Sequence, residues 1–107
     1  MPKIVWVIVK TNNLREAQKI GRAALGRRLV ACYDILPRIK GEYFWPPKKT
    51  KIQTSHGPNL ILETLARNVQ PLKTLIKKQH SDQLPFIGIL KLEMEHNFYH
   101  WLKHEIK

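Results

Sequence analysis

The six residues IVWVIV at positions 4–9 are apolar without interruption, all β-branched or aromatic, and they are followed by Lys10. A run this short and this rich in branched residues predicts a strand rather than a helix. An antiparallel strand with one face in water normally alternates apolar and polar residues, and this one does not. Residues 60–62 and 86–90 come close to the same pattern. We therefore expect a sheet whose two faces both need cover.

The segments around this strand alternate between helical and extended patterns. Apolar residues recur at helical spacing over residues 14–28, and Asn13 with Glu16 resembles a capping box. A second helix is predicted after Asn68, which can cap it, with Pro71 tolerated in the first turn. The other expected elements are strands over 29–45 (interrupted near Pro37 and Gly41), 60–65 and 84–93, a loop over 48–58, and a helix over 97–106.

The resulting order is βαββαβ with a terminal helix. This is the split βαβ pattern of a ferredoxin-like α+β sandwich, and the length predicts a single domain over residues 1–107. Two main helices can cover only one face of such a sheet. We therefore expect the second face to meet other copies of the chain in an oligomer.

Composition narrows the classes of function. The chain has 19 Lys and Arg against 8 Asp and Glu, a formal charge of +11, and its 43% hydrophobic content excludes a largely disordered chain. A single cysteine, Cys32, excludes a disulfide-stapled scaffold and a multi-cysteine zinc site. With no signal segment or membrane span in the pattern, a cytoplasmic protein is expected. No nucleophile with a catalytic signature is present, so we expect no enzyme.

The segment LVACYDILP at residues 29–37, followed by YFW at 43–45, resembles the CutA divalent-cation tolerance family. That family reads roughly Leu-Ala-Ala-Cys-x-Asn-Ile-x-Pro and then Tyr-x-Trp at the same distance. The likeness extends over nearly the whole chain, through a second helix that runs into His80, to Glu93 and Trp101. The resemblance implies a trimer of ferredoxin-like subunits, similar in architecture to the PII signalling proteins. It also implies a link to tolerance of copper and other divalent cations, with no established catalytic activity.

Several polar positions depart from the family pattern. Glu63 stands where the family usually has Lys, and its His-Pro-Tyr-x-x-Pro is here HSDQLP at residues 80–85, followed by Phe86 instead of Glu. Pro46 replaces the Gly that usually follows the hairpin Trp, and the hairpin loop is a few residues longer. The resemblance therefore supports the fold of the family better than it supports the binding of any particular ligand.

Two sets of residues are candidate metal ligands. Cys32 and His80 match family positions suspected of holding a cation, and a thiolate with an imidazole suits copper or zinc. The alternative is a structural Cys and a His at a helix end. His96, His100 and His104 recur every four residues, so one pair on the terminal helix could chelate a cation, while the alternative is a polar helix face.

Aromatic residues mark a further region. Tyr43, Trp45 and Trp101 are predicted to line a cleft or a contact between subunits, with Glu63 as a polar neighbour. A weaker interpretation is a PII-like sensor that holds a small anionic ligand between subunits.

The basic residues give the main rival function. The outward faces of the two helices carry Arg15, Lys19 and Arg22 on the first and Lys73, Lys77 and Lys78 on the second. Such a surface would attract nucleic acid or another polyanion, so the alternative function is a basic ferredoxin-like binding module. The alternative is that these basic side chains only form a solvent-exposed helix surface and bind no partner.

Overall fold

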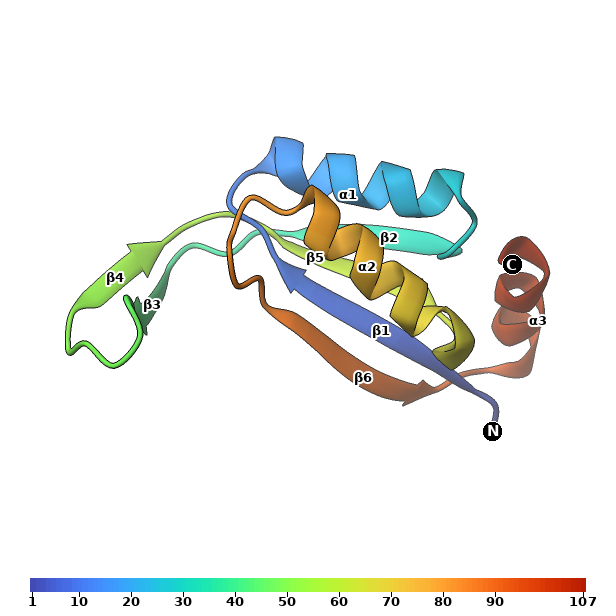
Figure 1. Cartoon of the computed structure of the whole chain (residues 1–107). Coiled ribbons are helices and arrows are strands. Elements are labelled where there is room, and N and C mark those ends of the chain that lie inside the picture. Colours follow the sequence, from blue (N-terminus) through green and yellow to red (C-terminus); the bar gives the residue numbers. More distant parts are fainter.

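The chain folds into six strands and three α-helices, and the computed structural model describes all of residues 1–107 (Figure 1). The predicted strand at residues 4–9 forms the interior of β1. The elements are β1 (Lys3–Lys10), α1 (Leu14–Gly26), β2 (Cys32–Leu36), β3 (Gly41–Phe44), β4 (Ile52–Ser55), β5 (Asn59–Thr64), a 3₁₀ turn (Ala66–Asn68), α2 (Val69–Gln79), β6 (Ile87–Glu93) and α3 (His96–Glu105).

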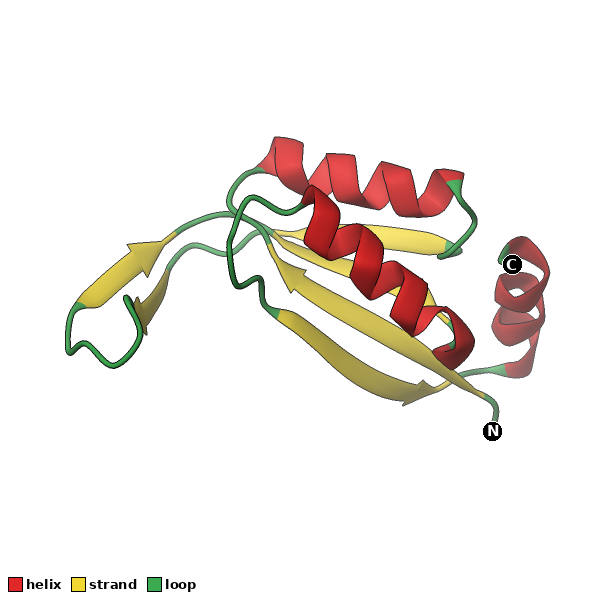
Figure 2. Cartoon of the chain, viewed as in Figure 1, coloured by secondary structure: helices red, strands yellow, loops and turns green.

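Four of the strands form one antiparallel sheet in the order β2-β5-β1-β6. Helix α1 connects β1 to β2 and α2 connects β5 to β6, and both helices lie on the same face of the sheet (Figure 2). This arrangement confirms the predicted ferredoxin-like α+β fold. None of the helices combines the length and the apolar composition that a membrane-crossing segment needs.

The main core lies between the sheet and the two helices. Val5, Val7 and Val9 of β1 alternate toward this side, where they pack with Leu60 and Leu62 of β5, and all five are at most 4% exposed. The strand period of two then sends the residues between these valines to the second face.

The second face is covered at one end by α3. Ile4 packs there with Leu65 and with Leu102 and Ile106 at the end of the chain, in a second buried cluster. The expectation that this face depends wholly on other copies is therefore wrong at this end. Farther along the sheet, Leu90 of β6 remains 45% exposed.

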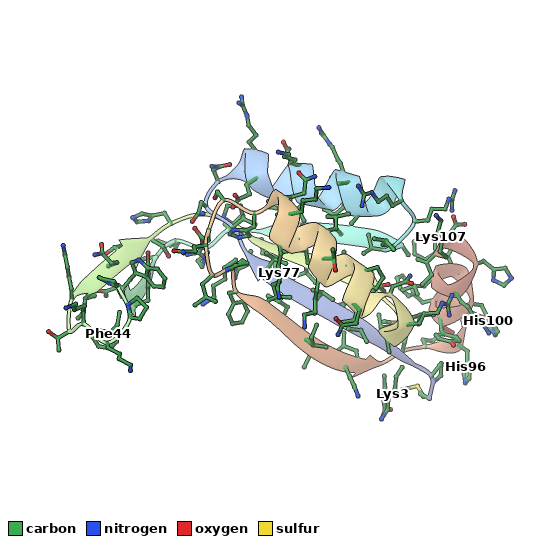
Figure 3. All side chains as sticks on the ribbon, viewed as in Figure 1. Lys3, Phe44, Lys77, His96, His100 and Lys107 are labelled. Carbon is green, nitrogen blue, oxygen red and sulfur yellow. The ribbon has the colours of Figure 1, made fainter.

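Strands β3 and β4 form a separate two-stranded sheet that projects from the body of the molecule (Figure 1). The prediction of an irregular loop over residues 48–58 is wrong for Ile52–Ser55, which pairs with β3 from Gly41↔Ser55 to Phe44↔Ile52. Backbone pairing rather than burial stabilises β4, so its side chains show no apolar pattern. Phe44, on this hairpin, is 65% exposed (Figure 3).

The predicted cap of α1 is present. Asn13 accepts a hydrogen bond from the Glu16 backbone N–H at 2.8 Å. The Glu16 carboxylate accepts from the backbone N–H groups of Asn12, at 3.0 Å, and of Ser81, at 2.8 Å. The N-terminus of α1 is thus joined to the segment that follows α2.

The predicted cap of α2 is wrong. The side chain of Asn68 makes no capping hydrogen bond, because its amide donates instead to the carbonyls of Leu29 and Lys107, both at 3.2 Å. Asn68 therefore fastens the end of the chain to the segment before β2.

Candidate functional site

Cys32, Glu63 and Trp6 form a row across three strands on the second face of the sheet. Glu63 of β5 pairs with Cys32 of β2 on one side and with Trp6 of β1 on the other. The Trp6 indole N–H donates to a Glu63 carboxylate oxygen at 2.8 Å, and Glu63 is 8% exposed. Since paired residues of neighbouring strands share a face, the thiol lies next to a buried carboxylate.

This environment keeps the Cys32 thiol protonated. Burial, followed by the negative charges of Glu63 and Asp34 and a hydrogen bond with Glu63, together raise the pKa of Cys32 to about 11. The thiolate is the form that binds metals, so a cation at Cys32 must displace a proton.

His80 lies at the end of α2 and is 8% exposed. Its Nε2 is 2.7 Å from the Lys10 carbonyl oxygen, which can only accept, so Nε2 carries the proton and donates. Its Nδ1 accepts from the Asp82 backbone N–H at 2.9 Å. Nε2 therefore joins the end of α2 to β1, Nδ1 holds the segment that follows α2, and in this arrangement neither nitrogen has a lone pair free for a cation.

Cys32 and His80 lie at different ends of the sheet. In the register of the sheet, Cys32 lies in the same row as Trp6, since both pair with Glu63. His80 contacts Lys10, which is four residues farther along β1 than Trp6. Four strand residues span about 13 Å. Within one chain, the predicted pairing of these two side chains on one cation is therefore not supported by the register.

The three histidines of α3 lie on the surface, and Figure 3 shows His96 and His100 at the end of the molecule opposite the projecting hairpin. His104 donates from Nδ1 to the His100 carbonyl at 2.7 Å, and Glu95 caps α3 by accepting from two backbone N–H groups. No group of three or more His, Cys, Asp or Glu side chains is close enough to hold a metal ion.

Two of the predicted cleft residues, Tyr43 and Trp45, line a cavity of about 430 Å³. Trp101 lines a different cavity, of about 310 Å³, and Glu63 lines neither. The sequence reasoning missed Arg38, which also lines the larger cavity. The sequence around Arg38 gives no sign that it lines a cavity, because its hydrogen-bond partners Asn59, Ser55 and Thr11 lie in segments that only the fold brings together.

The six basic residues of the rival hypothesis lie on the helix layer. Lys77, labelled in Figure 3, lies on α2, and five of the six side chains are exposed, while Lys73 is half-buried. None of them takes part in an ion pair within the chain. Glu16, the one acidic residue of α1 and α2, is buried, so this layer presents positive charge alone.

The chain is similar to known proteins over almost its whole length. A family model described as CutA1 divalent ion tolerance protein matches residues 5–105. The chain belongs to the CutA1 family. This confirms the resemblance drawn from the motif at residues 29–37.

Similar CutA proteins cover most of the chain. The divalent-cation tolerance protein CutA of Citrobacter koseri is 27% identical over 90 residues, which are 84% of this chain and 76% of that protein. The CutA of Yersinia pestis is 28% identical over 87 residues, 80% of this chain and 71% of that protein. The CutA structure from Xylella fastidiosa has a TM-score of 0.89 at 25% identity and covers 97% of this chain and 98% of its own.

A further structure, CutA1 from Oryza sativa, shows the shared fold. Its TM-score is 0.90 at 24% identity, with 98% of this chain and 94% of that chain covered. None of these CutA relatives lends support to the nucleic-acid alternative.

Proposed function

We propose that the chain acts in divalent-cation tolerance as a non-catalytic CutA1 protein that binds copper or another divalent cation as a homotrimer. The observation that carries the proposal is the family match over residues 5–105. The exposed part of the second sheet face supports the assembly, because an apolar surface of this kind is typical of subunit contacts. A cytoplasmic location stays a prediction, since a similar structure from Archaeoglobus fulgidus is described as periplasmic.

The proposed cation site centres on Cys32. A cysteine sulfur is a soft ligand that favours copper and zinc, and Glu63, its neighbour across the strands, adds a negatively charged oxygen. Two ligands of one chain leave a cation with open positions, which water or a second subunit can fill.

Titration calorimetry with Zn²⁺, which does not oxidise thiols, tests this proposal. We expect Cys32→Ser to weaken Zn²⁺ binding at least about tenfold, because the thiolate supplies the strongest ligand. Since the pKa of Cys32 is about 11, the affinity of the intact chain should rise about tenfold for each pH unit between 6 and 8, and Cys32→Ser should lose this slope.

Two variants separate the candidate ligands. His80→Gln should leave the affinity unchanged, because both nitrogens of His80 already form hydrogen bonds. Replacing His96, His100 and His104 together by Gln should also leave it unchanged. Binding that survives Cys32→Ser and disappears in the triple variant would assign the cation to α3 and contradict the proposal.

A further inference from the structure

A cavity of about 430 Å³ lies beyond the end of β1, between the β3–β4 hairpin and the segment at residues 81–86. This volume is within the range of sites that hold small molecules. The side chains that matter for its chemistry are Lys10, Arg38, Tyr43, Trp45, Asp82 and Phe86. None of them belongs to the row around Cys32, so the cavity is separate from the proposed cation site.

Arg38 builds one wall of the cavity and holds it rigid. Its guanidinium donates to the Asn59 side chain at 3.0 Å, to the Ser55 hydroxyl at 2.7 Å and to the Thr11 carbonyl at 2.8 Å. Arg has five N–H groups, so two remain for a ligand. No carboxylate of the chain forms an ion pair with Arg38, and its positive charge is therefore unneutralised.

Lys10 supplies a second positive charge beside an aromatic ring. Its ammonium lies 4.9 Å from the centroid of the Phe86 ring, and it has no ion-pair partner. A Cβ at Gly88 would lie 3.0 Å from the Phe86 ring, so the absence of a side chain there lets the ring pack against β6. Phe86 is nevertheless 49% exposed. One side of the ring is thus supported while the rest of it remains accessible.

The hairpin contributes further aromatic side chains to the lining of the cavity. Tyr43 is 47% exposed and Trp45 is half-buried, and both line the cavity. Of the two acidic residues there, Glu42 forms an ion pair with Lys40 at 3.4 Å. Asp82 accepts from the Asn12 side chain at 2.8 Å. The neutral amide of Asn12 does not cancel the charge of Asp82, so the lining holds two cations without an ion-pair partner, Lys10 and Arg38, against the one carboxylate of Asp82, within a chain of charge +11.

We propose that this cavity binds a small organic anion with a flat aromatic body. The ring of such a ligand packs against the Tyr43 side chain and the exposed part of Phe86 that Lys10 leaves uncovered, while its carboxylate, sulfonate or phosphate lies against Lys10 and the free N–H groups of Arg38. The combination of aromatic side chains with two cations in the lining of one cavity defines this ligand class.

Calorimetry with 1-naphthyl phosphate, in buffer containing a chelator, tests the proposal independently of any metal. We expect 1-naphthyl phosphate to bind at least about tenfold more tightly than 1-naphthol or inorganic phosphate, because each of these offers only half of the contacts. Lys10→Gln should weaken binding about tenfold, in the range expected for losing one charge-assisted hydrogen bond.

Lys3→Gln is the matched control, because Lys3 is also exposed, lies at the other end of β1, and its loss changes the net charge equally. It should leave the affinity unchanged, whereas Phe86→Leu should weaken binding of 1-naphthyl phosphate but not of inorganic phosphate. Equal losses in Lys10→Gln and Lys3→Gln would show attraction by overall charge only and overturn the proposal. So would inorganic phosphate binding as tightly as 1-naphthyl phosphate, or no binding of 1-naphthyl phosphate at millimolar concentration.

Discussion

Gly21 is a residue at which α1 packs closely against the sheet. A Cβ at this position would lie 2.7 Å from two ring atoms of Tyr33 on β2, and Gly21 itself is buried. We expect Gly21→Ala to lower the free energy of unfolding by up to about 2 kcal/mol, because an overpacking cost of about 1–3 kcal/mol outweighs the roughly 1 kcal/mol that Ala gains over Gly in a helix. Urea unfolding at fixed protein concentration measures this change. Gly26→Ala is the control, since nothing lies within 4 Å of its added Cβ, and an equal loss in both variants would contradict the explanation.

The sequence identifies candidate site residues more easily than it identifies the groups that contact them. The family motif singled out Cys32 and His80, but hydrogen bonds with residues remote in sequence decide what they can do. The Lys10 carbonyl accepts a hydrogen bond from His80 Nε2. Because this acceptor is a backbone group, no pattern of side chains in the sequence reveals it. Arg38 was missed for a related reason, since its partners come from three different segments.

At the level of elements, Glu16 fastens α1 to the end of α2. Burial raises the pKa of Glu16, but hydrogen bonds from Ser81 and Asn12 and the proximity of His80 outweigh it, so the pKa is lowered from 4.5. A carboxyl whose pKa is lower in the folded state stabilises the fold above pH 4.5, and this contribution disappears as the pH falls through the folded-state pKa.

We therefore expect urea midpoints to fall between pH 5 and 3 more steeply in the intact chain than in Glu16→Gln. At pH 7 the same variant should cost about 2 kcal/mol, the usual contribution of hydrogen bonds to a charged group. Glu42→Gln is the control, because Glu42 is exposed on the hairpin. A pH profile identical in the intact chain and in Glu16→Gln would exclude this role for Glu16.

The sequence predicts well those helices and strands that bury a row of apolar side chains. It does not predict a strand that is stabilised mainly by backbone hydrogen bonds. β1, α1 and β5 were recognised because their apolar residues face the core, so burial imposes a period on the sequence. β4 was missed because both of its faces are largely exposed, and β6 begins at Ile87 rather than at Leu84 because Pro85 and its neighbours pair with no strand.

At the scale of the whole molecule, the unbroken apolar pattern of β1 has two causes. One face lies under α1 and α2, as the fold class predicts, and α3 covers the start of the other. The sequence predicted α3 but could not tell which layer it joins, because its moderate amphipathic pattern fits either face of a sheet. What remains uncovered is the middle of the second face and, on the hairpin, the exposed side chains of Phe44 and Ile52.

The proposed trimer makes a specific prediction for this uncovered region. Leu90, on the second face opposite Trp6, is 45% exposed, and Leu25, at the end of α1, is 42% exposed. Glu at either position would be solvated in an isolated chain, but a carboxylate buried in a subunit contact is costly. We expect Leu90→Glu to lower the mass measured by light scattering from three times 12.6 kDa toward that of one chain, while Leu25→Glu leaves it unchanged.

The measurement is best made at about 0.15 M NaCl, where screening limits the repulsion between chains of charge +11. Circular dichroism of both variants separates dissociation from unfolding. A monomeric mass for the unmodified chain at micromolar concentration would rule out the trimer. An unchanged mass in Leu90→Glu would show that the copies meet elsewhere, and the projecting hairpin with its exposed Phe44 would then be the remaining apolar surface for the contact.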